Sequence, residues 1–144
     1  MYKRIFVDAN VLLDLHDPER PTNLSSQKAL GFLVEDEEVE LFSSCDLMTT
    51  LYYVLAKSEG KEIALSFVSE INTLCRLIPF DNDAIERVCE LMALDSGFTD
   101  MEDTLQYYLA RQAECDLVLS NDQAFYSPDI PLLGTESFVR KYGL

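Results

Sequence analysis

Short apolar runs alternate along the chain with longer segments whose apolar residues recur every three or four positions. The short runs predict buried strands at residues 4–7, 39–42, 77–78, 117–119 and 130–133. The longer segments predict amphipathic helices at residues 11–15, 25–35, 43–57, 62–74, 82–94, 100–114 and 135–141. Strands that alternate with helices indicate a mostly parallel sheet with helices on both faces. We therefore expect one α/β domain over residues 1–144, built as a three-layer α/β/α sandwich.

The composition favours a folded cytoplasmic protein. Hydrophobic residues make up 48% of the chain, and no apolar stretch approaches the roughly 20 residues that cross a bilayer. No signal-peptide pattern follows the N-terminus, because Asp8 interrupts the first apolar run. The four cysteines include no CxxC pair, and His16 is the only histidine, so we expect no zinc site. We interpret the cysteines as buried, reduced thiols.

The net charge narrows the range of partners. It is −15, and the 11 lysines and arginines are scattered, so we expect no broad basic surface for nonspecific binding of nucleic acid. An acidic protein can still contact phosphate groups through bound divalent cations. A basic partner chain is a second use for the charge.

Three aspartates occupy positions that a parallel sheet brings together. Asp8 directly follows the first predicted strand, and Asp122 follows the strand at 117–119 by a few residues. Asp103 lies in the first turn of the helix that leads into that strand. Ligands of such folds bind beyond the carboxyl ends of the strands, where all three should meet. Converging carboxylates repel one another, and Mg²⁺ or Mn²⁺, which prefer oxygen ligands, relieve that repulsion.

Each aspartate taken alone also has a purely structural explanation. Asp8 can be an ordinary residue at a strand end, and Asp122 can belong to an Asn-Asp turn. Asp103 can be the partner of a helix cap formed by Thr99 or Asp100. Their shared edge is what favours a metal site over three separate structural roles.

At these residues the sequence resembles the PIN-domain nucleases, and within them the VapC-like branch of bacterial toxin–antitoxin pairs. Residues 6–14 (FVDANVLLD) resemble the first motif of the family, whose leading Asp is a metal ligand. Residues 100–106 (DMEDTLQ) resemble the central motif, in which Asp103 takes the ligand position. Residues 119–125 (LSNDQAF) resemble the closing motif, with Ser120 and Asp122 at its two polar positions.

The resemblance implies more than the residues alone do. It implies a five-stranded parallel sheet, cleavage of single-stranded RNA and one or two Mg²⁺ or Mn²⁺ ions held by Asp8, Asp103 and Asp122. It implies that Asn10 and Ser120 orient this acidic site by hydrogen bonding, whereas their structural alternative is that of polar residues at a turn and a strand end. It also implies an antitoxin protein as partner, and homodimers, which are common in the family.

One position departs from the family pattern. The family usually carries a glutamate early in the helix after the second strand, and residues 50–55 (TLYYVL) place Thr50 there. A threonine hydroxyl cannot replace the charge of a carboxylate. Asp46, one helical turn earlier, is a candidate substitute, although we favour a capping role for it because Ser43 and Asp46 have capping-box spacing. Glu102, next to Asp103, is the other candidate.

Two functions follow from these observations. The first is a metal-dependent endoribonuclease that cleaves RNA with metal-activated water, in the setting of a toxin–antitoxin pair. The alternative is a degenerate PIN domain with weak or no catalysis that acts as a protein-binding module, which Thr50 and the acidic charge favour. A haloacid-dehalogenase-like phosphatase is disfavoured, since that family needs a second Asp where this chain has Asn10.

Overall fold

Five parallel strands form the centre of the molecule, in the order β3-β2-β1-β4-β5. A computed structural model describes all residues 1–144. The strands are β1 (Arg4–Val7), β2 (Glu40–Ser44), β3 (Cys75–Ile78), β4 (Leu117–Leu119) and β5 (Leu132–Leu133). The helices are α1 (Ala9–Asp14), α2 (Asn23–Val34), α3 (Leu47–Glu59), α4 (Lys61–Leu74), α5 (Asn82–Leu94), α6 (Met101–Gln112) and α7 (Thr135–Tyr142). The expected parallel sheet and alternation of elements are confirmed.

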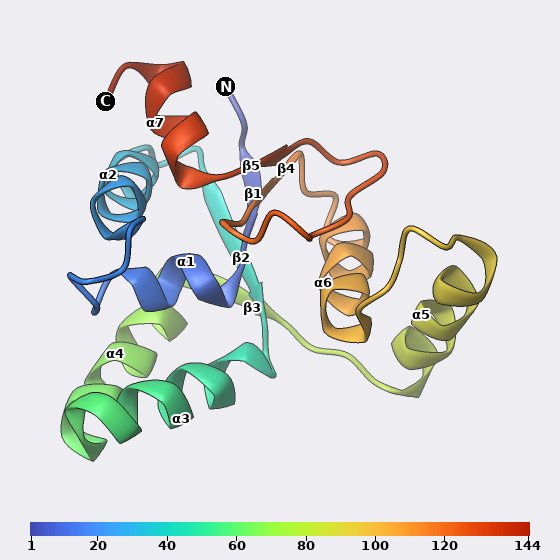
Figure 1. The fold of residues 1–144 in the computed structure, drawn as a ribbon, viewed down its shortest axis with the longest axis horizontal. Helices are drawn as coiled ribbons and strands as arrows, with labels where there is room; N and C mark the ends of the chain where they lie inside the picture. The colour runs from blue at the N-terminus through green and yellow to red at the C-terminus, as the bar shows by residue number, and fades with distance from the viewer.

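The helices cover both faces of the sheet. In Figure 1, α5 and α6 lie on one side, and α1, α2, α4 and α7 lie on the other, with α3 packed beside α1 and α4. The central strand β1 and its neighbour β4 are deeply buried, since Ile5, Phe6 and Val7, like the three residues of β4, have no exposed surface. Phe6 is in register with Phe42 of β2 and Val118 of β4, which extends the core across the sheet.

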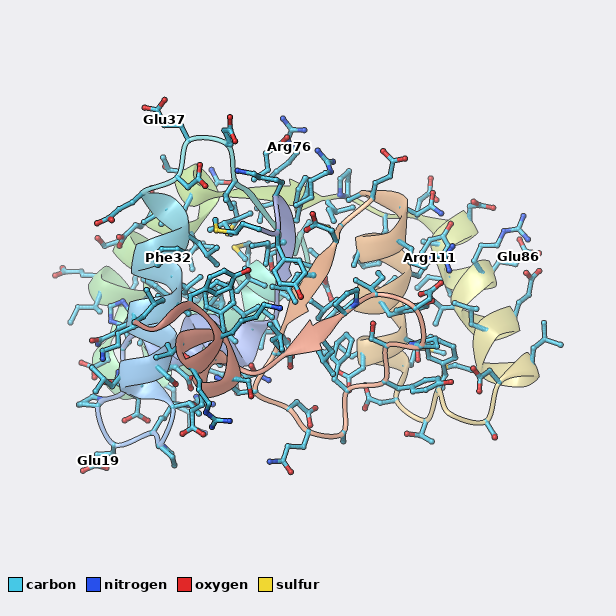
Figure 2. All side chains as sticks on the ribbon, turned by 90° about the horizontal axis from the view of Figure 1, so that it is seen from above. Glu19, Phe32, Glu37, Arg76, Glu86 and Arg111 are labelled. Atoms are coloured by element: carbon cyan, nitrogen blue, oxygen red, sulfur yellow. The ribbon has the colours of Figure 1, made fainter.

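Charged side chains project from the surface around this core. Figure 2 shows Glu19, Glu37 and Glu86 projecting outward from three separate segments, whereas Phe32 points inward from α2. The ring of Phe32 lies 6.2 Å from that of Phe138 in α7, centroid to centroid, so α2 and α7 are joined by aromatic packing. None of the seven helices is long and apolar enough to span a membrane.

Two expectations about local structure are wrong. The helix expected from residue 43 begins at Leu47, because Ser43 and Ser44 complete β2 and are fully buried. The hydroxyl of Ser43 donates to the carbonyl oxygen of Val7 across the sheet (3.1 Å), so it is not available to cap a helix. Of the cysteines, Cys75 and Cys115 are buried as expected, but Cys45 and Cys89 are exposed; all four are free thiols.

Candidate active site

The order of the strands creates a point where ligands bind in open parallel sheets. The chain moves outward from β1 through β2 to β3, then returns to the other side of β1 with β4. The carboxyl ends of β1 and β4 therefore flank the place where the strand order reverses. Asp8 lies there, and its backbone N–H donates to the carbonyl oxygen of Leu119 (3.0 Å).

The carboxylate of Asp8 is buried and held by two side chains. It is only 6% exposed, and its Oδ2 accepts hydrogen bonds from Nδ2 of Asn10 (3.0 Å) and from the hydroxyl of Ser120 (2.8 Å). Burial raises the pKa of Asp8, the hydrogen bond from Ser120 works against that rise, and the negative charge of Asp122 adds to it. Asn10 and Ser120 thus fix the orientation of this carboxylate, while its Oδ1 accepts no hydrogen bond from another side chain.

Asp122 lies on the turn that follows β4. Its backbone N–H donates to the hydroxyl of Ser120 (3.1 Å), and its Oδ1 accepts from the backbone N–H of Ala124 (2.9 Å). The turn expected from the Asn-Asp pair is therefore present. It occupies one carboxylate oxygen of Asp122 and leaves Oδ2 without a hydrogen bond, so the turn and a role as ligand are compatible.

Asp103 lies in the first turn of α6, as expected. Asp100 precedes this helix and accepts a hydrogen bond from the backbone N–H of Asp103 (2.9 Å), so the cap is Asp100 and the carboxylate of Asp103 is left free of it. Burial raises the pKa of Asp103 to about 7, helped by the charges of Asp100, Asp8, Asp122 and Glu102. None of the ion pairs of the chain involves Asp8, Asp103 or Asp122. The three aspartates of the motifs therefore lie within electrostatic reach of one another on one rim.

Asp46 and Glu102 belong to the same acidic rim. Burial raises the pKa of Glu102, and the charges of Asp46, Asp8 and Asp100 raise it further. Asp46 occupies the N-cap position of α3, but the capping by its side chain that we favoured is wrong, since that side chain makes no hydrogen bond to the start of the helix. Instead its Oδ1 accepts from the hydroxyl of Ser44 (2.5 Å). Thr50, one turn further along α3, is exposed.

The candidate ligands have the right chemistry for a hard divalent cation, but their side chains are not already arranged around one ion. All the candidate ligand atoms are carboxylate oxygens, which Mg²⁺ and Mn²⁺ prefer. No three histidine, cysteine, aspartate or glutamate side chains stand close enough together to hold one ion as they are placed. Mutual repulsion among uncompensated carboxylates favours such separation, and a bound cation would reverse it.

Sequence reasoning missed two buried polar residues, Asp14 and Gln106. Asp14, at the end of α1, is 1% exposed and accepts hydrogen bonds from several side chains, among them Asn121. Gln106, one turn beyond Asp103 in α6, has the only buried side-chain oxygen in the chain that lacks a hydrogen-bond partner. For Asp14 a signal was available, because a carboxylate four residues after Asn10 shares its face of α1.

Comparison with known proteins gives consistent matches over nearly the whole chain. A family model described as PIN domain matches residues 4–124. Ribonuclease VapC1 of Aquifex aeolicus (strain VF5) is 44% identical over 140 residues, which cover 97% of this chain and 96% of that relative.

Solved structures share the fold at low sequence identity. VapC20 of Mycobacterium tuberculosis, described as a sarcin-ricin loop cleaving toxin, has a TM-score of 0.70 at 14% identity, over 88% of this chain and 95% of that one. FitAcB from Neisseria gonorrhoeae has a TM-score of 0.70 at 19% identity, over 92% and 98%. VapBC2 from Rickettsia felis, bound to a DNA fragment from its promoter, has a TM-score of 0.70 at 17% identity, over 91% and 98%.

Proposed function

Because this chain belongs to the PIN-domain family, we propose that it is an endoribonuclease that uses Mg²⁺ or Mn²⁺ to hydrolyse single-stranded RNA. The observation that carries the proposal is the rim of carboxylates around Asp8 and Asp103, neither of which forms an ion pair with a lysine or arginine. A group of acids whose pKa values are raised by burial and by one another is typical of a functional site rather than of a surface ion-pair network.

We propose Asp8, Asp103 and Asp122 as the residues that hold the cation. When bound, a divalent cation supplies positive charge that activates water and stabilises the charge on phosphate oxygens. Asn10 and Ser120 hold one oxygen of Asp8 and keep the other directed away from them. Hydrolysis by water in line with the leaving 3′ oxygen would leave 5′-phosphate and 3′-hydroxyl ends.

Asp46 and Glu102 are proposed as auxiliary ligands in place of the glutamate that Thr50 replaces. Both contribute negative charge to the rim, and Glu102 is coupled to Asp8 as well as to Asp46. Asp46 already accepts a short hydrogen bond from Ser44, which limits it to one free oxygen. We expect a site of this composition to bind the cation more weakly than one with a fourth carboxylate directly in it.

A toxin role with an antitoxin partner is supported by the relatives. VapC1 is named a ribonuclease, VapC20 is described as a toxin, and VapBC2 was solved on a DNA fragment from the promoter of its own genes. The charge of this chain favours a basic partner segment. Six of its 11 cationic side chains are already ion-paired within the chain: Lys3, Arg4, Arg20, Arg76, Arg87 and Arg111.

The second candidate function is a protein-binding module without catalysis. Two observations favour it: Thr50 stands where the family usually has an acid, and no three acids are placed ready to hold one ion. A calorimetric titration with Mn²⁺ discriminates between the candidates. Saturable binding that Asp8→Asn abolishes supports the nuclease, whereas no binding at millimolar Mn²⁺ supports the module.

A further inference from the structure

Asn121 lies between Ser120, which donates a hydrogen bond to Asp8, and Asp122 of the acidic rim. Both ends of its side-chain amide form hydrogen bonds. The Nδ2 group donates to Oδ2 of Asp14 (2.9 Å) and to the hydroxyl of Ser26 (3.2 Å). The Oδ1 atom accepts from the backbone N–H of Thr135 (2.8 Å) and from its hydroxyl (3.1 Å). Asn121 therefore links the turn after β4 to α2 and to the start of α7.

Asp14 accepts several of the hydrogen bonds in the buried group of polar side chains around Asn121, which we call the buried cluster. Besides Asn121, its Oδ2 accepts hydrogen bonds from the hydroxyls of Thr22 and Ser26, both at 2.7 Å. Its Oδ1 is ion-paired with Nε of Arg20 (2.7 Å). A carboxylate that is 1% exposed is tolerated only when partners satisfy it in this way, and the same partners hold it rigidly.

The short helix α1 contacts Asn121 at two points. Asn10 and Asp14 are four residues apart and share one face of α1. Oδ1 of Asn10 accepts from the backbone N–H of Asn121 (3.1 Å), while Asp14 accepts from its side chain. The Nδ2 group of Asn10 also donates to Asp8 (3.0 Å). One face of α1 thus connects the buried aspartate before the helix to the turn that carries Asp122.

We propose that Asn121 and Asp14 are positioning residues that set the place of Asp122 relative to Asp8. Neither is needed as a ligand, since their side-chain atoms are already used in the buried cluster. Side chains that orient metal ligands commonly change metal affinity by 10–100-fold when they are removed. The inference rests on the proposed function for its consequence in metal binding, but the positioning itself is a property of the metal-free protein.

The metal-free test uses Asn121→Ala and a matched control, Thr22→Val. Each variant removes one hydrogen bond to Oδ2 of Asp14, but only Asn121→Ala also removes the hydrogen bonds that join the turn after β4 to Ser26 and Thr135. With EDTA present, we expect amide hydrogen exchange at Asp122 and Ala124 to accelerate about 10-fold or more in Asn121→Ala and to stay within about 2-fold in Thr22→Val. Unchanged exchange in folded Asn121→Ala overturns the proposal. If that variant does not fold, Asn121→Ser, whose hydroxyl is too short to join Asp14 to Thr135, replaces it with the same expectation.

The second measurement is Mn²⁺ affinity by calorimetry in the absence of RNA. We expect Asn121→Ala to bind Mn²⁺ about 10–100-fold more weakly than the unsubstituted chain, and Thr22→Val to bind it normally. Equal affinity in Asn121→Ala overturns the inference while leaving the proposed nuclease intact. Absence of Mn²⁺ binding to the unsubstituted chain contradicts the proposed function, and the exchange measurement then still decides whether the turn is held by Asn121.

Discussion

The hydroxyl of Ser120 donates a hydrogen bond of 2.8 Å to the carboxylate of Asp8, although the two residues are far apart in sequence. The same hydroxyl accepts from the backbone N–H of Asp122 (3.1 Å). One small side chain therefore touches two of the three proposed ligands. This relationship explains why a residue with a hydroxyl follows β4 directly, where an apolar residue would continue the strand.

Replacing Ser120 by alanine should impair the site more than the fold. A hydrogen bond to a charged group is worth about 1.5–3 kcal/mol, and Asn10 remains to hold Asp8 in the variant. We expect Ser120→Ala to lower Mn²⁺ affinity about 10-fold or more in calorimetry, while circular dichroism stays unchanged. Ser120→Thr keeps the hydroxyl and is the control; a variant without the hydroxyl that binds Mn²⁺ normally would refute the role of Ser120.

Substitution of Asp8 by asparagine should abolish metal-dependent cleavage of RNA and leave the fold intact. The side chain keeps its shape, so the hydrogen bonds from Asn10 and Ser120 have an oxygen to meet, but the negative charge is lost. We expect no cleavage by Asp8→Asn in Mn²⁺, with an unchanged circular dichroism spectrum. Cleavage at the rate of the unsubstituted chain would show that Asp8 is not a ligand.

The raised pKa of Asp103 predicts a stability that depends on pH in the metal-free protein. Its pKa is about 7 in the folded chain, whereas the unfolded value is the ordinary 3.8. Between these values the folded state binds more protons, so the free energy of unfolding falls as pH rises through this range. The loss of unfolding free energy is complete above pH 7. We expect it to amount to only about 1–2 kcal/mol, because the side chain is partly exposed and solvent screens its charge.

Asp103→Asn removes the carboxylate whose ionisation lowers the free energy of unfolding. We expect the variant to melt at a higher temperature than the unsubstituted chain at pH 8 in EDTA, and the difference to vanish near pH 4. Added Mn²⁺ should raise the melting temperature of the unsubstituted chain at pH 8 but not that of the variant. Identical melting temperatures of both proteins at pH 8 in EDTA would show that the ionised carboxylate of Asp103 does not destabilise the folded chain.

Restoring an acid at position 50 should strengthen the site. Thr50 is exposed on α3, one turn after Asp46, whose charge already reaches Glu102. We expect Thr50→Glu to bind Mn²⁺ about 10-fold more tightly and to cleave RNA faster. Thr49→Glu is the matched control, since Thr49 is also exposed on α3 and the charge change is equal. An equal gain in both variants would indicate a general effect of charge rather than a ligand at position 50.

The sequence predicted the sheet and the acidic rim because both follow from local patterns. The strands at 4–7 and 117–119 and the helix at 82–94 have the expected bounds, since apolar runs and periodicity mark them clearly. Asp8, Asp103 and Asp122 could be grouped because parallel strands and a preceding helix share one edge of the sheet. None of these steps needed knowledge of contacts between distant side chains.

The features that the sequence did not predict depend on such contacts. The start of α3 was misplaced because the hydroxyl of Ser43 bonds across the sheet to Val7 rather than to its own helix. The spacing of Asp14 from Asn10 was a signal, but the burial of Asp14 depends on its partners Ser26 and Asn121, which come from other parts of the chain. A capping box and an amphipathic pattern describe a segment alone, and tertiary hydrogen bonds override both.

Cleavage of RNA by the purified chain, with Mn²⁺ in one sample and EDTA in the other, tests the account most directly. Mapping of the ends identifies the chemistry, and Asp8→Asn run in parallel excludes a contaminating nuclease. We predict cleavage of single-stranded RNA in Mn²⁺ alone, with 5′-phosphate and 3′-hydroxyl ends and none from the variant. Cleavage that persists in EDTA, or that the Asp8→Asn sample shows equally, would contradict the assignment of the acidic rim as a metal-dependent nuclease site.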